Sequence, residues 1–372
     1  MKPLRILADD LTGALDCAAA FGAGVPVHLG HPATQSQDVI DVDIDIVATA
    51  TRDVPPTELA TLLEPSLGWM RGAGVAFKKI DSLLRGNTFD EVDWLARQGG
   101  FNGVALIPAF PAQNRITKQG QQWWCKPDGS VDPVAESITH SLQARGWHIE
   151  TGHKAPTSQS AATAWVPDVL NDHDLDTVAD FALKNTGWLW CGSAGLAHAL
   201  ARRLPARPPA AISAHETGQI VFISASHHTV TREQWRVLRS SPFPAMYFSG
   251  EDLHTLNSGS LNHPLLIDLS SEAPLSAAQA TSLLQAQTKV IAQHAQRPRA
   301  LVVVGGDTLL ALCRAVGANS LVSETALDRT GWGCARLSGG AWDGVLCHTR
   351  SGAFGAANDL LDVMNLLEKN SS

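Results

Sequence analysis

The sequence predicts an α/β protein with two domains, each built on a mostly parallel sheet that is flanked by helices. Three observations lead to this prediction. Short apolar runs alternate with helical patterns along almost all of the 372 residues. Several runs are continuous in Val, Ile and Leu, which is typical of parallel strands covered on both faces. The chain is also longer than one hydrophobic core usually supports, so two domains are expected.

The expected strands are short and are mostly followed by helices. A helix over residues 88–97 illustrates the pattern, because Thr88 is a suitable cap and acidic residues occupy the first turn. The sequence predicts strands over residues 4–8, 45–48, 75–78, 103–107, 188–191, 219–223, 265–269, 300–304 and 344–348. It predicts helices over residues 11–21, 88–97, 175–183, 196–204, 230–239, 277–295, 308–316 and 357–367.

The clearest break in this alternation is rich in proline. Pro205, Pro208 and Pro209 fall within five residues, which a helix or a central strand does not tolerate. We therefore expect an N-terminal domain of residues 1–205, a Pro/Ala-rich linker of residues 206–217 and a C-terminal domain of residues 218–372. A second irregular zone, residues 113–133, is interpreted as a long loop or hairpin of the first domain.

Composition favours a cytoplasmic enzyme. The net charge of −8, from 28 basic and 36 acidic residues, argues against nucleic acid or an anionic membrane as a partner. The six cysteines form no CxxC pair, which indicates reduced and mostly buried thiols. The N-terminus has no apolar core of a signal peptide, and no apolar run approaches the length of a membrane span.

Polar side chains crowd the segment that follows the strand predicted over residues 75–78. Lys78, Lys79, Asp81, Ser82 and Arg85 bring two ammonium groups, a carboxylate, a hydroxyl and a guanidinium into one strand-to-helix connection. Ligands of α/β proteins bind at the carboxyl ends of strands. The segment therefore predicts a site for a small, polar, anionic molecule. The alternative is a solvated loop with an internal Asp81–Arg85 ion pair.

Two further connections of the first half carry chemistry. Asp9 and Asp10 end the first strand, where one of them could accept a proton from a substrate hydroxyl. The alternative is that one caps the helix and the other faces water. Gln113, Asn114 and Arg115 follow a turn stiffened by two prolines, and their donors suit hydroxyls and a carboxylate. A rigid loop with a surface arginine is the alternative there.

The second half contains three connections rich in Gly and Ser, over residues 222–229, 304–309 and 349–355. Glycines allow close backbone approach, and the N-terminus of a helix offers N–H groups to an anion. Three such loops in one domain indicate a phosphate site. The Walker pattern, a complete GxGxxG and a GxSxG elbow are all absent from the sequence. Adjacent histidines at 227 and 228 do not have the spacing of a structural metal site.

In order along the chain, these segments resemble the four-carbon acid sugar kinases, the kinases of threonate, erythronate and 3-oxo-tetronate. Residues 8–16 resemble the N-terminal signature of that family, residues 78–87 its KxDSTLRGN segment, and residues 108–117 its PAFPxxGR segment. Residues 224–234, 305–308 and 350–355 are similar to its SGSCSxxTxxQ, GGDT and KSGGFG patterns. The sequence departs from these patterns at Leu83, Asn114, Ala225, His227, Arg350 and Ala353, which leaves the exact substrate open.

The resemblance implies that the N-terminal domain binds a sugar acid and that the C-terminal domain binds ATP with Mg²⁺. It assigns catalytic roles to Asp10, Asp81 and Arg85, and contacts with the sugar acid to Asp9, Lys79, Ser82 and Arg115. Contacts with the nucleotide fall to Ser224, Ser226, Gly305, Gly306, Asp307, Thr308 and Gly352. No protein side chain is assigned as a metal ligand.

The expected function is therefore an ATP-dependent kinase of carbohydrate metabolism that phosphorylates a terminal hydroxyl of a small sugar acid. The base stays open among Asp9, Asp10 and Asp81, and the substrate carboxylate is expected on Arg85 or Lys79. A non-catalytic sensor of sugar acid or nucleotide is the alternative, and a nicotinamide-dependent oxidoreductase is a third hypothesis. The expected partners are the sugar acid and ATP, without nucleic acid or membrane, and a homodimer is left open.

Overall fold

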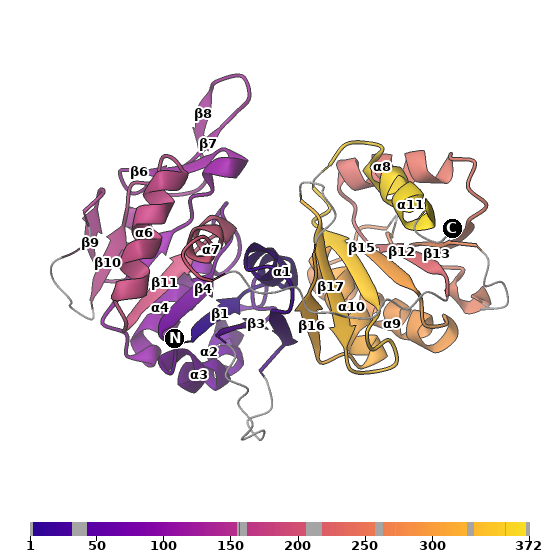
Figure 1. Cartoon of the computed structure of the whole chain (residues 1–372), viewed down its shortest axis with the longest axis horizontal. Helices are drawn as coiled ribbons and strands as arrows, with labels where there is room; N and C mark the ends of the chain where they lie inside the picture. Colours follow the sequence, from indigo (N-terminus) through magenta and orange to yellow (C-terminus); the bar gives the residue numbers. More distant parts are fainter. Residues whose placement is uncertain are drawn as a thin grey trace. The chain divides into compact units, whose positions relative to one another are not determined.

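The chain folds into two compact units, within residues 1–208 and within residues 209–372. A computed structural model describes residues 3–31, 43–154, 156, 162–205, 218–256, 263–271, 273–325, 331–353 and 355–369. The linker predicted over residues 206–217 lies outside the described residues. Each unit contains a mostly parallel sheet with helices packed on it (Figure 1), so the predicted fold class is confirmed.

The sheet of unit 1 is parallel throughout. Its strands lie in the order β2-β3-β1-β4-β11-β5-β10-β9. Every neighbouring pair is parallel, which agrees with the continuous apolar runs that buried strands require. The bounds are β1 Leu4–Ala8, β2 Pro26–Leu29, β3 Ile44–Ala48, β4 Val75–Lys79, β5 Gly103–Ile107, β9 His148–Thr151, β10 Thr163–Val166 and β11 Trp188–Gly192.

Helices cover both faces of this sheet (Figure 1). One set places Leu63, Met70, Val92 and Leu142 in the same buried core as strand residues such as Leu106. This set is α2 Leu59–Leu63, α3 Leu67–Arg71, α4 Thr88–Gly99 and α5 Ile138–Gln143. The other set, α1 Leu11–Ala20, α6 Asp172–Lys184 and α7 Ala194–Ala201, packs side by side on the other face.

A small antiparallel sheet forms within the zone predicted as a long loop or hairpin. It consists of β6 Arg115–Lys118, β7 Gln121–Cys125 and β8 Val131–Pro133, in that order. The hairpin of β7 and β8 projects from unit 1 (Figure 1). Trp124 on this hairpin is 43% exposed, so it is not part of the core.

The sheet of unit 2 is mixed at one side. Its order is β13-β14-β12-β15-β18-β17-β16, parallel from β13 to β18, with β17 antiparallel to both of its neighbours. The strands are β12 Ile220–Ser224, β13 Met246–Ser249, β14 Leu265–Asp268, β15 Ala300–Val304, β16 Ser320–Ser323, β17 Gly333–Ser338 and β18 Leu346–Arg350. The helices are α8 Thr229–Arg239, α9 Ala277–His294, α10 Gly306–Val316 and α11 Asp359–Lys369, and α8 and α11 share one buried core with the sheet.

Both units reverse their strand order at one point. In unit 1, the chain continues from β1 to β2 and β3 on one side and then places β4 on the other side of β1. In unit 2, β13 and β14 lie on one side of β12 and β15 lies on the other. Such a switch point opens a crevice beyond the carboxyl ends of the strands, where α/β proteins bind ligands. Each unit thus offers one such position, between β1 and β4 and between β12 and β15.

The start of α4 differs from the prediction. Thr88 was expected to cap this helix, but Asn87 occupies the capping position and Thr88 is the first helical residue. The side chain of Asn87 forms no cap. Its amide instead donates to the backbone oxygens of Thr51 at 3.0 Å and Val54 at 2.7 Å, and so joins two loops.

Six strands of the two larger sheets were not predicted. They are β2, β9 and β10 of unit 1 and β13, β16 and β17 of unit 2. β18 was predicted, but it covers residues 346–350 rather than 344–348. β17 carries Arg336, which is buried and donates to Glu324 at 2.8 Å. A buried charge interrupts the apolar pattern by which strands are recognised.

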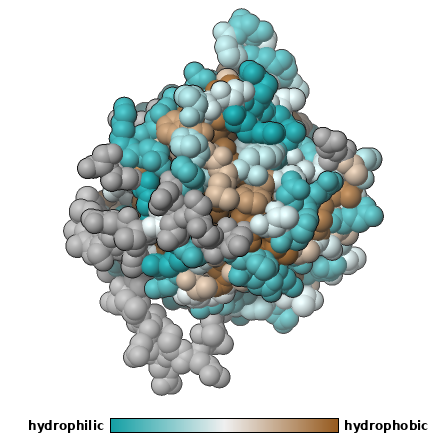
Figure 2. Space-filling model, turned by 90° about the vertical axis from the view of Figure 1, so that its right-hand side faces the viewer, coloured by the Kyte–Doolittle hydropathy of each residue, from teal (hydrophilic) through white to brown (hydrophobic). Residues whose placement is uncertain are grey.

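A few large apolar side chains of the described residues are exposed. The face shown in Figure 2 has apolar residues gathered in its middle, framed by hydrophilic ones. Exposed large apolar residues of the described chain include Leu62, Val131, Leu275 and Leu283. All six cysteines are unpaired, and only Cys125 is not fully buried. Within the described ranges, no helix combines the length and apolar character needed to cross a bilayer.

Candidate active site

The first candidate site lies at the point where the strand order of unit 1 reverses. β1 and β4 are parallel neighbours, with Ala8 at the end of β1 in register with Lys79 at the end of β4. Asp9 and Asp10 follow β1 directly, and Asp81 follows β4 after one residue. Because parallel strands end at the same edge of a sheet, the two predicted segments come together here.

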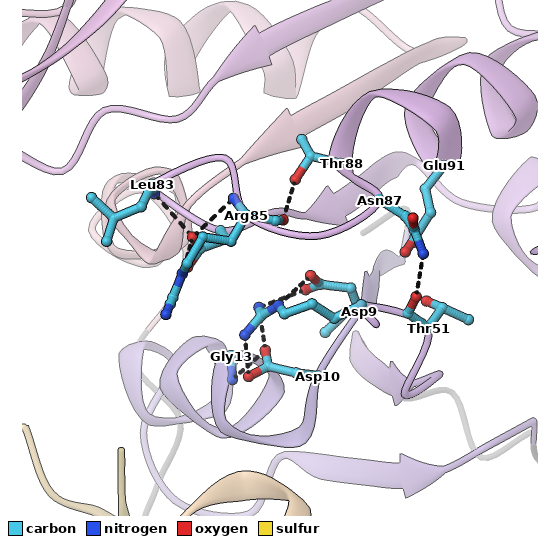
Figure 3. A network of polar contacts seen from close by, with 12 residues as sticks. Asp9, Asp10, Gly13, Thr51, Leu83, Arg85, Asn87, Thr88 and Glu91 are labelled. Atoms are coloured by element: carbon cyan, nitrogen blue, oxygen red, sulfur yellow. Dashed lines mark hydrogen bonds and ion pairs between the residues drawn. The ribbon is translucent and has the colours of Figure 1, made fainter. Parts of the chain in front are cut away.

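Asp9 and Asp10 converge on the guanidinium of Arg52 (Figure 3). Arg52 Nε and Nη2 donate to the two carboxylate oxygens of Asp9, at 2.8 and 3.0 Å. Arg52 Nη1 and Nη2 donate to the two oxygens of Asp10, both at 2.8 Å. Forked, charge-assisted hydrogen bonds of this kind are strong and directional. Arg52 therefore fixes the two carboxylates relative to each other.

Arg52 is a site residue that the motif pattern does not reveal. It comes four residues after β3, a strand that the sequence predicted almost correctly. β3 pairs with β1, so the carboxyl end of β3 lies at the same edge of the sheet as Asp9. A charged residue shortly after a predicted strand was a usable signal, but only the strand order shows that this strand is the neighbour of β1.

The two adjacent aspartates have different environments. Asp10 caps α1, since its Oδ1 accepts a hydrogen bond from the backbone N–H of Gly13 at 3.0 Å. Asp9 does not face water, because it is only 4% exposed. Burial alone would raise the pKa of Asp9, but the charges of Lys78 and Arg52 outweigh burial and lower it. The alternative expected one aspartate to cap the helix, which is correct for Asp10. It expected the other to face water, which is wrong for Asp9.

The two lysines of the predicted segment diverge. Successive side chains of a strand point to opposite faces of the sheet. Lys78 lies 2.6 Å from Glu91 of α4, and both side chains are 1% exposed. Lys78 is therefore a structural ion pair beneath the site. Lys79, on the other face, is also buried, and burial opposes its charge, yet the acidic groups around it, Cys17 and Asp10 among them, raise its pKa.

Gly13 shows how closely Lys79 and Asp10 approach α1. A Cβ atom at Gly13 would lie 2.5 Å from Asp10 Oδ1 and 2.6 Å from Lys79 Nζ. Both distances are far below a normal contact. The absence of a side chain at position 13 thus leaves room for the ammonium group beside the carboxylate at the start of the helix.

Asp81 and Arg85 form the ion pair that was the structural alternative for this segment. Arg85 Nε and Nη2 each donate to one oxygen of Asp81 at 2.8 Å, and the backbone N–H groups of Leu83 and Arg85 also donate to Asp81 Oδ2 (Figure 3). Burial raises the pKa of Asp81, but the hydrogen bonds from Arg85 and its charge prevail and lower the pKa to about 2. The loop is not simply solvated, since Asp81 is 7% exposed.

Arg115 reaches the same loop from the base of the small sheet. Its Nη1 donates to the hydroxyl of Ser82 at 2.8 Å and to the amide oxygen of Gln113. Gln122 of β7 donates to the backbone oxygen of Ser82 at 3.0 Å and accepts from Thr117 at 2.7 Å. The base of the hairpin, rather than its tip, therefore contacts the site. All seven residues predicted for the first half lie in this region: Asp9, Asp10, Lys79, Asp81, Ser82, Arg85 and Arg115.

The second candidate site lies at the switch point of unit 2. Ser224 is the last residue of β12, Gly305 directly follows β15, and Gly352 follows β18 after one intervening residue. The three connections touch one another. Gly305 N–H donates to Arg350 O at 2.9 Å, and the hydroxyl of Thr231 donates to Gly352 O at 2.6 Å. The residues predicted for the second half thus also gather at one edge of a sheet.

The N-terminus of α10 offers backbone donors at this edge. Gly305 occupies the capping position with φ of 108° and, as a glycine, provides no side-chain cap. The unmet N–H groups of a helix start, together with the helix dipole, favour a negative charge. A Cβ at Gly352 would lie 2.3 Å from Ser226 Oγ, so the neighbouring loop also depends on glycine for its close approach. The donor set fits phosphate groups.

Arg350 occupies a buried position next to these loops. It is 1% exposed, pairs with Asp359 of α11 at 2.7 Å and donates to Gln234 of α8. Its guanidinium also lies 4.9 Å from the ring centroid of Trp332. This arginine therefore joins β18 to α8 and α11 inside unit 2 and positions the start of the Gly352 loop.

Comparisons with known proteins show what this chain is similar to. Residues 4–148 match a family described as a sugar-binding N-terminal domain, a range that includes all seven site residues of unit 1 and Arg52. A D-threonate kinase of Cupriavidus necator is 27% identical over 87% of this chain and 88% of that relative. A D-threonate kinase of Bordetella bronchiseptica is 26% identical over 96% of each. The chain is thus similar, along most of its length, to relatives named as kinases of a four-carbon sugar acid.

A solved structure has the same fold as this chain. The crystal structure of a Salmonella typhimurium LT2 protein superposes with a TM-score of 0.74 at 19% identity. The match covers 98% of this chain and 99% of that one. The α/β architecture of both units is therefore shared along the whole length.

Proposed function

We propose that this protein is an ATP-dependent kinase that phosphorylates the terminal hydroxyl of a small sugar acid. The substrates we expect have four carbons, such as threonate, erythronate or a 3-oxo-tetronate. Relatives named D-threonate kinase, which align with nearly the whole chain, support the reaction class. The crowded charges at the switch point of unit 1 support a polar, anionic substrate.

One observation carries the mechanism: among the three site aspartates, Asp10 is the carboxylate most open to a ligand. Its side chain is 20% exposed, against 5% for Asp9 and 10% for Asp81. Asp81 is also a poor proton acceptor, because its pairing with Arg85 outweighs burial and lowers its pKa to about 2. We therefore assign Asp10 as the general base and Asp9 as a buried partner that helps to fix Arg52.

The proposed transfer is a direct one. The hydroxyl oxygen forms a bond to the γ-phosphorus while the bond to the β–γ bridging oxygen breaks, and ADP leaves with that electron pair. Asp10 takes the hydroxyl proton. Phosphoryl transfer depends mainly on positioning and on neutralising charge. Lys79, cationic and buried beside Asp10, supplies positive charge close to the reacting hydroxyl.

Unit 2 is the proposed site for ATP. The uncapped start of α10, with Gly305, Gly306 and Thr308, would hold phosphate oxygens through backbone N–H groups. Ser224, Ser226 and Gly352 line the adjoining connections. Mg²⁺ bound with the nucleotide would neutralise part of the charge of the phosphates. The carboxylate of Asp307 lies in the first turn of α10, in the same loop.

The test is ADP production by the purified protein with Mg²⁺-ATP and a panel of sugar acids. The panel contains the D and L forms of threonate and erythronate, their 3-oxo forms, and glycerate. Asp10→Asn keeps an acceptor for the helix cap but removes the base, so we expect turnover to fall by about 10²–10⁴-fold. Exposed Asp43→Asn is the matched control and should keep full activity.

Two outcomes would contradict the proposal. Near-normal turnover by Asp10→Asn would show that another group takes the proton. Absence of ADP above background with every acid, from protein that still binds ATP, would favour a non-catalytic sensor instead.

A further inference from the structure

Three guanidinium groups of unit 1 differ in their counter-ions. Arg52 contacts two carboxylates, and Arg85 contacts one through two of its nitrogens. The side-chain partners of Arg115 are the neutral hydroxyl of Ser82 and the neutral amide of Gln113. Among the residues that the structure describes, Arg115 is thus the site arginine without a paired carboxylate.

Arg115 is also partly removed from water. Its Nε is shielded from solvent and has no hydrogen-bond partner within the described part of the chain. Burial lowers its pKa, yet a guanidinium stays protonated at neutral pH. Holding a charge away from water is costly unless an opposite charge is present. The environment of Arg115 therefore suits a ligand that brings its own carboxylate.

Arg115 and Asp10 have different partners within the site. Arg115 contacts Ser82, the residue that follows Asp81. Asp10 contacts Arg52 and the backbone N–H of Gly13 instead. Arg115 and the proposed base therefore belong to separate clusters of hydrogen bonds. A ligand that touches both clusters would place one functional group at each.

We propose that Arg115 binds the carboxylate of the sugar acid, with Gln113 and Ser82 as positioning residues that hold its guanidinium. This inference rests on the proposed function and replaces the earlier expectation that Arg85 or Lys79 pairs with that carboxylate. Two nitrogens of Arg85 are already committed to Asp81. With the carboxylate at Arg115 and the terminal hydroxyl at Asp10, the product carries its phosphate on the terminal oxygen.

The decisive measurement compares a charged ligand with a neutral one of the same length. Dissociation constants of D-threonate, D-erythronate and the corresponding four-carbon polyols are measured by calorimetry for the wild type and for Arg115→Gln. A charge-assisted hydrogen bond corresponds to about 10–150-fold in binding. We therefore expect Arg115→Gln to weaken acid binding by about 10–150-fold and to change polyol binding less than about threefold.

Further variants separate recognition from folding. Gln113→Ala should weaken acid binding several-fold while kcat at saturation stays within about twofold, since it acts only through Arg115. Arg115→Lys keeps the positive charge but not the forked guanidinium. Its affinity for the acid should lie between those of the wild type and Arg115→Gln. Arg236→Gln, at a surface pair with Glu233, is the matched control and should bind the acid normally. Thermal melting checks that each variant is folded.

Several results would overturn the inference. Equal loss of acid and polyol binding in Arg115→Gln would show that Arg115 has a general structural role. Unchanged binding of the acid would show that another residue binds the carboxylate. Phosphate on the hydroxyl next to the carboxylate, detected by ³¹P NMR of the product, would reverse the proposed orientation. Failure of the kinase reaction itself would appear separately, as normal acid binding without ADP release, so the two proposals are distinguished.

Discussion

At the scale of single residues, neighbours in sequence have different contacts at this site. Lys78 forms a buried ion pair with Glu91, whereas Lys79 points toward α1 and Asp10. The same holds for Asp9 and Asp10, of which only the second remains open to a ligand. Side chains alternate across a strand, and strand ends inherit that alternation. Adjacent charges in a motif therefore need not share a role.

Asp81 leads to a pH-dependent prediction. Its pKa falls from an ordinary value of 3.8 to about 2 in the folded protein. Its contribution to stability is therefore complete above the unfolded value and disappears as the pH falls from about 4 to about 2. At pH 7 we expect Asp81→Asn to lower the free energy of unfolding by about 1–2 kcal/mol, less than the full shift because Arg85 is largely exposed.

Urea unfolding of Asp81→Asn and the wild type at several pH values measures this effect. The difference between the two proteins should shrink as the pH approaches 2. Asp43→Asn, at an exposed carboxylate, should match the wild type throughout. A difference that stays constant with pH would mean that lost backbone contacts of the loop, rather than charge, cause the destabilisation.

At the scale of elements, the starts of helices carry the candidate chemistry. α1 begins beside Lys79 with Asp10 as its cap, and α10 begins after Gly305 without a side-chain cap. A capped helix start holds a carboxylate in place, while an uncapped one leaves N–H groups for an anion. The start of a helix thus holds a carboxylate in unit 1, whereas in unit 2 it offers N–H groups that suit an anion.

Gly13 offers a test of how closely α1 must approach the site. In Gly13→Ala the new methyl group would meet Asp10 Oδ1 at 2.5 Å and Lys79 Nζ at 2.6 Å, so both side chains must move. We expect kcat to fall by at least about tenfold, because displacement by even 1 Å at a reacting centre is costly. Steady-state kinetics measures the loss.

The matched control for this variant is Gly68→Ala in α3. A Cβ at Gly68 meets nothing within 4 Å. Alanine there should leave kcat unchanged and raise stability by about 0.5–1 kcal/mol, because it restricts the unfolded chain. Equal kinetic effects of the two substitutions would argue against a special role of the α1 start.

At the scale of the whole molecule, two α/β units each carry one candidate site at one switch point. The strands at these points keep the same local order, with β3-β1-β4 in unit 1 and β14-β12-β15 in unit 2. The order of strands decides where ligands bind in such sheets, so each unit has its own expected ligand site. The proposed function assigns the sugar acid to the charged site of unit 1 and the phosphates of ATP to the backbone donors of unit 2.

This division predicts separate footprints in hydrogen exchange. A sugar acid should slow exchange of amides in residues 81–88 and 113–118, and ATP should slow exchange in residues 305–309 and around Gly352. At a ligand concentration of 100 times the dissociation constant, amides that open through local unfolding should slow by up to about 100-fold. Protection of residues 305–309 by the acid alone would contradict the assignment of ATP to unit 2.

The sequence by itself determined the α/β class, half of the strands and the loops that carry the site. These features are local: apolar runs mark buried strands, and polar or glycine-rich segments directly follow them. The zone of the small sheet that holds Arg115 was predicted only as a long loop or hairpin, and the strands β2, β9, β10, β13, β16 and β17 were not predicted. Their patterns are short or interrupted by charge, as at Arg336, so a local pattern carries little signal there.

Only the tertiary structure decided how the candidate residues divide their roles. The pairing of Arg52 with Asp9 and Asp10 joins residues about 40 positions apart and depends on β3 lying beside β1. The choice of Asp10 as base depends on its exposure, and the choice of Arg115 as carboxylate ligand depends on which charges are already paired. Pairing and burial are properties of the packed structure, and they arise from strand order, which no single segment of the sequence encodes.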